Sequence, residues 1–287
     1  MKNLKMKKVL LLVFAVVFSV FTYAQDAAEK LNQAQEAMKA QDYAKAYQLY
    51  DDAMSNIGDV QVDAAINFNI GYAAYKAENL EGAVKYFDKA IESGTNVSKS
   101  HEYKALAYND KKDYENAVAS FEKAIETATE GADELNYSAG VAAYRAKMFE
   151  KAAGFFGNAY EAGYKGESAI YYKAVVLKSM DKDDEYKATL EEGIAKYPGD
   201  DKLSKALAGV YVSEANDLYK AGADILGEAN KKVNAGSLTT DDAAYTAEVA
   251  KAQVEFKKAI EILEKAKTLD ASNKNVQTLL DACKAVL

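Results

Sequence analysis

The sequence is poor in the residues that build disulfides, metal sites and nucleophilic active sites. Its 287 residues include one cysteine, Cys283, and one histidine, His101. A single cysteine forms no internal disulfide, and a lone histidine has no second histidine or cysteine with which to share a metal. No serine or cysteine lies in a nucleophile elbow, and adjacent acids such as Asp183 and Asp184 diverge on a helix. We therefore predict that the chain is not an enzyme and has no metal or cofactor.

Arginine is almost absent, and the charge balance is acidic. Arg145 is the only arginine, and the chain has 44 acidic against 36 basic residues. Four of the lysines lie in the first eight residues, so the remainder has 32 basic residues and a net charge near −12. Nucleic-acid phosphates and anionic lipids are bound by clusters of lysine and arginine. The composition therefore predicts neither nucleic acid nor an anionic membrane surface as a partner.

Residues 1–24 have the layout of a secretory signal peptide. Four lysines precede an apolar run over residues 9–21, and small Ala24 stands before Gln25. An uncleaved membrane anchor is the alternative, but this run falls short of the roughly 20 residues that span a bilayer. We expect cleavage after Ala24 and no membrane insertion afterwards. This layout is similar to that of exported proteins of Gram-negative bacteria, which implies a periplasmic or extracellular location.

A twelve-residue pattern recurs along the chain at residues 43–54, 80–91, 114–125 and 149–160. Each copy has an alanine three residues after an aromatic residue or leucine, and the steps between those alanines are 37, 34 and 35 residues. A degraded fifth copy ends at Gly193. These offsets place an apolar stripe on one helix face, and a period near 34 with two helices per period is typical of a helical solenoid.

A second apolar helix is expected before each of the later copies. It carries Gly71, Ala105 or Gly140, and the same interval separates each of these small residues from the alanine of its copy. The two helices of each pair must therefore cross closely at these positions, since a large side chain would hold them apart. We call the first helix of each pair helix A and the second helix B.

These motifs resemble the tetratricopeptide repeat family. The small residue in helix A, the aromatic residue that opens helix B, the Ala-x3-Phe-x2-Ala of helix B and Pro198 after the fifth copy all match its pattern. The resemblance covers about residues 26–198, although the tryptophan that the family carries in helix A is missing. It implies an all-α fold, a right-handed superhelical solenoid of helix hairpins, and a non-enzymatic scaffold that binds a protein or peptide.

The resemblance also implies a binding surface, because the family's concave face is lined mainly by helix A. Aligned on Gly71, Ala105, Gly140 and Ala174, the candidate partner-binding residues are Phe68, Tyr72, Tyr75, Asn109, Tyr137, Tyr144, Arg145, Tyr171 and Lys178. Large aromatic side chains suit an extended peptide or a sugar. The alternative is that these aromatics pack between repeats. The family's lysine and asparagine clamp for a terminal carboxylate does not fit these positions.

After Pro198 the apolar spacing lengthens into a near-heptad pattern. It runs through Tyr211, Ala215, Leu218, Gly222, Ile225, Ala229 and Val233, and returns through Tyr245, Val249, Ala252, Phe256, Ile260, Leu263 and Ala266. We expect a sixth, modified repeat whose helices form a long antiparallel hairpin over residues 201–269, with arms of roughly 40–50 Å. A single bent helix or a separate three-helix cap is the alternative. Thr239 or Thr240 is expected to cap the return helix, and residues 275–287 to form a capping helix.

The sequence thus predicts three segments: a signal peptide (1–24), a repeat array of about five repeats (25–200), and the modified repeat with its cap (201–287), continuous with the array. The function we predict is a scaffold or adaptor of the bacterial cell envelope that binds a protein or peptide. Two alternatives stay open. One is glycan binding in the envelope, and the other is self-assembly into a homodimer through the 201–269 hairpin.

Overall fold

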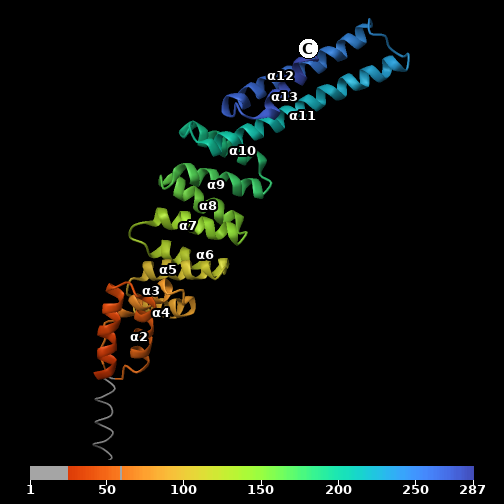
Figure 1. Ribbon diagram of the computed structural model, residues 1–287. Coiled ribbons are helices and arrows are strands. Elements are labelled where there is room, and N and C mark those ends of the chain that lie inside the picture. The colour runs from red at the N-terminus through yellow and green to blue at the C-terminus, as the bar shows by residue number, and fades with distance from the viewer. Residues whose placement is uncertain (1–24, 59) are drawn as a thin grey trace, which may run out of the picture. The chain divides into compact units, whose positions relative to one another are not determined.

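The computed structural model describes residues 25–58 and 60–287 (Figure 1). Among these residues every regular element is a helix, and none of the helices is long and apolar enough to cross a membrane. The all-α fold predicted from the sequence is therefore confirmed. The predicted signal peptide, residues 1–24, lies outside the described residues.

By their contacts the residues divide into two compact units, Met1–Ala159 and Tyr160–Leu287. In the first unit a helix over residues 25–39 precedes α2 (Tyr43–Ser55), α3 (Ile66–Lys76), α4 (Leu80–Glu92), α5 (Val97–Asp110), α6 (Tyr114–Thr127), α7 (Ala132–Arg145) and α8 (Phe149–Glu161), whose last residues belong to the second unit. The second unit continues with α9 (Gly166–Ser179), α10 (Asp183–Lys196), α11 (Asp201–Asn234), α12 (Ala243–Leu269) and α13 (Lys274–Lys284). The predicted segment boundary at residue 200 and the superhelical path stay predictions.

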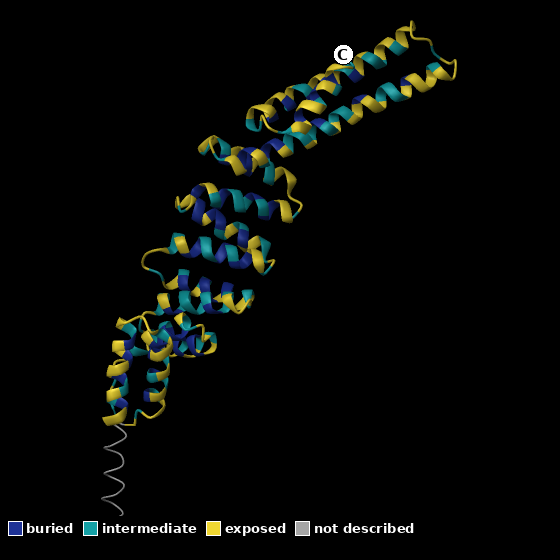
Figure 2. Ribbon diagram, in the orientation of Figure 1, coloured by how far each residue is buried: buried dark blue, intermediate teal, exposed yellow. Residues whose placement is uncertain are grey.

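Helix A and helix B cross where the sequence places glycine. A Cβ atom added to Gly71 of α3 would lie 2.7 Å from the ring of Phe87 in α4, and one added to Gly140 of α7 would lie 2.9 Å from the ring of Phe156 in α8. Both rings are fully buried, and Figure 2 shows buried residues along the helices of this unit. The predicted close crossing is confirmed at these two positions, because an added Cβ would clash with the ring as it lies.

The turn from helix A to helix B has one geometry in the first five repeats. Each turn contains a non-glycine residue in the left-handed region, with φ between 56° and 62°, at Gln41, Glu78, Lys112, Lys147 and Asp181. In the second repeat the amide of Asn79 donates to the carbonyl of Ala74 at 2.9 Å, which closes the end of α3 as a Schellman motif does. The side chain of Asn79 then accepts from the amide of Gly82 and caps α4. The end of one helix and the start of the next are thus fixed within one short turn.

Three turns between repeats have a glycine in the left-handed region. Gly94, Gly131 and Gly163 have φ of 73°, 72° and 80°, a conformation that favours glycine. The amides of Gly94 and Gly163 donate to the carbonyls of Ile91 and Tyr160, each at 3.0 Å. At these two positions the glycine therefore lies at the end of helix B and closes its last turn.

The long hairpin is present in the second unit. Helices α11 and α12 have 34 and 27 residues, about 50 Å and 40 Å at 1.5 Å per residue, and pack against each other (Figure 1). The buried residues of α11 include small ones at every seventh position, Ala208, Ala215, Gly222 and Ala229. A Cβ atom on Gly222 would lie 2.8 Å from the ring of Phe256, so this repeat also has a glycine under an aromatic ring.

The expected start of the return helix was wrong. Helix α12 begins at Ala243 and its N-cap is Asp242, so neither Thr239 nor Thr240 caps it. The carboxylate of Asp242 accepts from the amide of Thr239 at 2.6 Å instead, which closes the loop before the helix. A threonine followed by two aspartates fits both arrangements, because aspartate is as good an N-cap as threonine.

The terminal helix α13 covers the base of this hairpin. Its buried side chains, Val276, Leu280 and Cys283, pack in one cluster with the α11 and α12 residues Ala208, Phe256 and Leu263. Burial raises the pKa of the Cys283 thiol. The cysteine is therefore a packing residue.

Candidate partner-binding surface

The three aromatic residues predicted on α3 surround one tyrosine of the next helix A. The ring of Tyr103 in α5 lies 6.0 Å from Phe68, 5.3 Å from Tyr72 and 5.7 Å from Tyr75, between ring centroids. It also stacks on the buried ring of Phe87 at 5.8 Å. These residues therefore join the second repeat to the third, and all three predicted side chains are half-buried. Packing between repeats, the alternative weighed from the sequence, accounts for much of their apolar surface.

A row of polar contacts links the C-terminal ends of successive A helices. The hydroxyl of Tyr75 in α3 donates to Asp110 in α5 at 3.0 Å. In the next step Nη1 of Arg145 in α7 donates to Oδ1 of Asn109 in α5 at 3.1 Å. The partners in each bond are about one repeat apart in the sequence, so nearly the same two helix positions meet in both steps. We call Tyr75, Asn109, Asp110, Tyr144 and Arg145 the helix A row.

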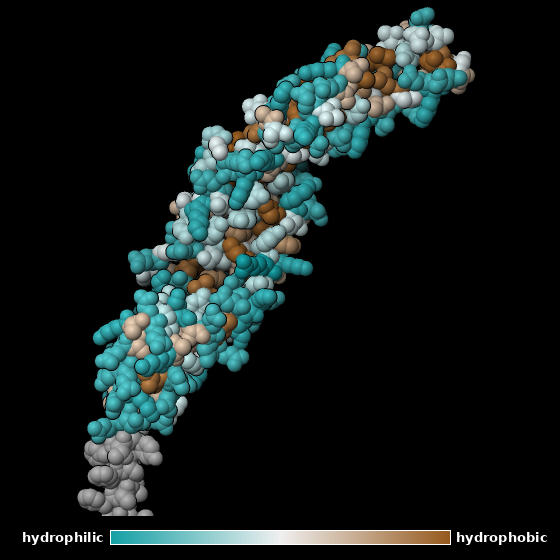
Figure 3. Space-filling model, in the orientation of Figure 1, coloured by the Kyte–Doolittle hydropathy of each residue, from teal (hydrophilic) through white to brown (hydrophobic). Residues whose placement is uncertain are grey.

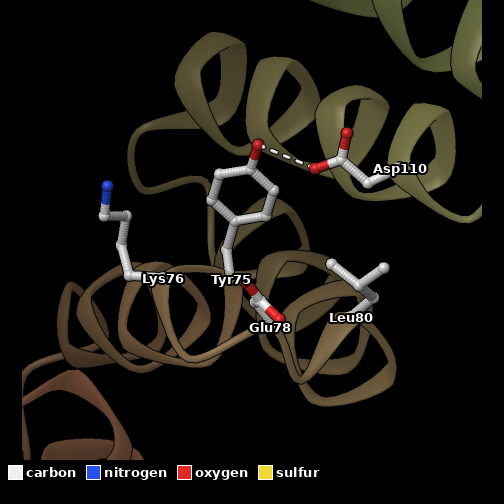
Figure 4. Close-up of a pocket in the computed structure, with 5 residues that line it drawn as sticks. All are labelled: Tyr75, Lys76, Glu78, Leu80 and Asp110. Atoms are coloured by element: carbon white, nitrogen blue, oxygen red, sulfur yellow. Dashed lines mark hydrogen bonds between the residues drawn. The ribbon is translucent and has the colours of Figure 1, made fainter.

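A cavity of about 470 Å³ opens at the first step of this row, a size typical of small ligand sites (Figure 4). It is lined by Tyr75, Lys76 and Glu78 at the end of α3, by Leu80 at the start of α4, and by Asp110 of α5. The ring of Tyr75 and the side chain of Leu80 form apolar walls beside the carboxylate of Asp110. The cavity thus combines flat apolar surface with negative charge.

The hydroxyl of Tyr75 stays protonated over an unusually wide pH range. Its burial, and next the hydrogen bond to the Asp110 carboxylate, raise the pKa of Tyr75 to about 12. A phenol that keeps its proton keeps donating to Asp110. This bond therefore holds the cavity wall in place at all ordinary pH values.

The other end of the row is more exposed. Tyr144 of α7 is 39% exposed, which makes it one of three large apolar side chains at the surface of the described residues, with Val254 and Leu287. The guanidinium of neighbouring Arg145 lies 5.8 Å from the centroid of the Tyr114 ring. Tyr137, by contrast, packs edge-on against the buried Phe156 at 5.7 Å. Of the two predicted tyrosines on α7, Tyr144 presents more apolar surface to a partner.

Two predicted residues, Tyr171 and Lys178, lie in α9 of the second unit. The ring of Tyr171 packs against Tyr172 at 5.5 Å. The ammonium of Lys178 forms an ion pair with Asp183 at 2.6 Å. A cavity of about 230 Å³ lies beside this pair, lined also by Lys187 and Glu214. It occupies the same place in its repeat as the Tyr75 cavity, because Lys178 corresponds to Tyr75 and Asp183 to Leu80.

Sequence reasoning missed two residues of the first unit. Aligning helix A on Ala105 places Glu102, three residues earlier, in the groove, and so Tyr103 was missed. An offset of one residue on a helix is a rotation of about 100°, which is enough to change the face on which a side chain lies. Asp110 was missed because its role depends on the tyrosine of the preceding repeat. A signal for Tyr103 existed, since Phe68, Tyr103 and Tyr137 recur at the period of the repeat.

Histidine and acidic residues do not form a metal-binding group anywhere in the described part of the chain. His101 of α5 is half-buried, and its burial, more than the nearby Lys104, lowers the pKa of its imidazole. A neutral half-buried imidazole fits a packing role.

The family follows from these repeats. Residues 31–98, from the first described helix to the start of α5, match the model of the tetratricopeptide repeat family. The close crossing within that segment, Gly71 under Phe87, recurs at Gly140 under Phe156. This segment belongs to the tetratricopeptide repeat family. Tetratricopeptide repeats are in general non-catalytic scaffolds that bind protein or peptide partners.

Solved tetratricopeptide repeat proteins are similar to this chain in fold. One from Bacteroides fragilis is 21% identical, with 91% of this chain and 99% of that chain covered and a TM-score of 0.40. One from Parabacteroides merdae is 20% identical with the same coverage and a TM-score of 0.49. YrrB, described as having an unusual peptide-binding site, is 18% identical over 75% of this chain and 91% of its own, with a TM-score of 0.46. Curated protein sequences give no match.

Proposed function

We propose that this chain is a non-enzymatic adaptor of the bacterial cell envelope that binds a protein or peptide partner through its helix A row. The observation that carries the proposal is the cavity at Tyr75 and Asp110, together with the Arg145–Asn109 bond and the exposed ring of Tyr144 on the A helices that follow. Cavity, polar donors and exposed aromatic surface lie on consecutive A helices. Such a surface suits an extended segment that contacts several repeats at once.

The ring contacts of the other predicted aromatic residues reduce the number of residues that we expect to contact a partner. Phe68, Tyr72 and Tyr137 contact rings within or between repeats, so they hold the helices that present the row. Partner contact is then expected at Tyr75, Asn109, Tyr144 and Arg145. Export of the chain, with cleavage after Ala24, is part of the proposal and rests on the sequence of residues 1–24.

Site-specific photo-crosslinking in the producing cell tests the surface. A photoreactive phenylalanine analogue replaces Tyr144 in one variant and Ala119, an exposed residue of helix B α6, in a matched control. We expect one defined partner to be captured from position 144 and not from position 119. Equal capture from both positions, or no capture from position 144, would contradict the proposed surface.

Three further measurements test the rest of the proposal. Mass spectrometry of the envelope fraction should find a mature chain that starts at Gln25, and an intact N-terminus or a cytoplasmic protein would contradict export. Light scattering and a glycan array address the alternatives. A dimer lost on shortening the hairpin tip would favour self-assembly, and glycan binding lost with Tyr144→Ala would favour a carbohydrate ligand.

A further inference from the structure

The cavity at Tyr75 contains two carboxylates that have no cationic partner among the described residues. The side chain of Glu78 forms no hydrogen bond or ion pair with any of them. Asp110 accepts from the Tyr75 hydroxyl at Oδ2, and its Oδ1 has only a long contact of 3.4 Å from Asn109. Several other carboxylates of the chain are paired with lysines, for example Asp51 with Lys85 at 2.9 Å. The two acids of the cavity therefore keep a free face.

The lysines near the cavity are directed elsewhere. The ammonium of Lys76 lies 5.7 Å from the centroid of the Tyr43 ring, and Figure 4 shows its side chain on the opposite side of Tyr75 from Asp110. Lys111, next to Asp110 in the sequence, lies 3.7 Å from Glu81. Neither lysine forms an ion pair with Glu78 or Asp110, and the lining of the cavity has two carboxylates against the one ammonium of Lys76.

In the equivalent cavity of the second unit, carboxylates form ion pairs with lysines of the chain itself. There Lys178, at the position of Tyr75, contacts Asp183 at 2.6 Å, and Lys187 contacts Glu214 at 2.7 Å. That cavity is about half the volume of the first, 230 against 470 Å³. In the fifth repeat lysines of the chain pair with two of the carboxylates that line the cavity, whereas Glu78 and Asp110 in the second repeat have no such pair within the described part of the chain.

We propose that the Tyr75 cavity binds the side chain of an arginine or lysine in the partner's peptide. The aliphatic stem of that side chain lies against the Tyr75 ring and Leu80, and its charged end reaches Asp110 and Glu78. This inference rests on the proposed function and names the chemistry that its first subsite selects. The acidic net charge of the chain favours the approach of a basic segment.

The test titrates N-acetyl-arginine methylamide into the isotope-labelled chain from Gln25 to Leu287, with the citrulline counterpart as a neutral probe of the same shape. Amide NMR signals of Tyr75, Leu80 and Asp110 report on the cavity. We expect the arginine probe to shift these signals and the citrulline probe to leave them unchanged. Raising the salt concentration to about 0.5 M should weaken the arginine effect, because partly exposed ion pairs are screened.

Three variants make the test specific. Asp110→Asn keeps an acceptor for the Tyr75 hydroxyl and so should fold normally, and Glu78→Gln changes only a charge. Each should weaken the arginine probe about threefold to fivefold, as expected for partly exposed pairs. Glu92→Gln, the same change on an exposed residue outside the cavity, should have no effect.

Several outcomes would overturn the inference. These are equal shifts from arginine and citrulline, unmoved cavity signals, or the same loss in Glu92→Gln as in the cavity variants. If the cavity signals stay unmoved while position 144 still captures a partner, the basic-residue subsite is wrong and the proposed function stands. Failure of both experiments would overturn the subsite and the binding surface together.

Discussion

A methyl group added at Gly71 would have to displace the ring of Phe87. The new Cβ would lie 2.7 and 2.8 Å from two ring carbons, and that ring is fully buried against Tyr103. Overpacking of this kind typically costs about 1–3 kcal/mol. Alanine recovers about 1 kcal/mol over glycine through helix propensity. We therefore expect Gly71→Ala to change the free energy of unfolding by between about zero and about 2 kcal/mol, in the destabilising direction.

The chain offers a control for each crossing. Gly154, inside α8, has nothing within 4 Å of an added Cβ, so Gly154→Ala should stabilise by about 1 kcal/mol. In the second unit Gly222→Ala meets the ring of Phe256, and Gly227→Ala on the same helix meets nothing. Urea unfolding followed by circular dichroism should therefore separate the members of each pair by about 1–3 kcal/mol. A Gly71→Ala variant as stable as Gly154→Ala would refute the close crossing.

Three further predictions concern hydrogen bonds and turns. Tyr75→Phe should lower the free energy of unfolding by about 1 kcal/mol near pH 8. Because the pKa of Tyr75 is raised to about 12, this difference between variant and wild type should vanish as the pH rises from 10 through 12 in denaturant titrations. Lys112→Gly should stabilise by about 0.5–1 kcal/mol in thermal unfolding, since it removes left-handed strain at φ of 62°. Hydrogen bonding, first from Tyr86 and then from Lys85, lowers the pKa of Asp51, so Asp51→Asn should destabilise at pH 7 and lose its effect below about pH 3.8. Stability equal to wild type at pH 7, in any of the three, would count against the bond or turn concerned.

The repeat architecture was predictable because it depends on local spacing. Glycine under an aromatic ring fixes a crossing between two helices that are neighbours in sequence, and both partners lie within one repeat. The position of Gly71 relative to Phe87 could therefore be predicted from the sequence. The hairpin was readable for the same reason, since small residues recur at every seventh position of α11.

The candidate surface was less predictable because it depends on contacts between repeats. The direction of Tyr103 follows from how α5 packs on α3 and α4, and that packing is not encoded in the spacing within either helix. The bond from Tyr75 to Asp110 joins residues of different repeats, so neither residue marks it alone. Residues that complete a site across repeats require the assembled structure.

The α11–α12 hairpin also has a mechanical consequence. At its base the hairpin packs against α13. At its far end a loop joins the two helices. There hydrophobic atoms reach the surface on the face shown in Figure 3, and Figure 2 shows mostly exposed and half-buried residues. The small residues at every seventh position of α11 let α11 and α12 pack closely. The two helices therefore move as one rigid arm of about 50 Å. A rotation of about 5° at its base would displace its tip by about 4 Å, roughly one side chain's breadth. A slight change in the packing of α10 against α11 would therefore move the end of the hairpin far enough to make or break a contact there.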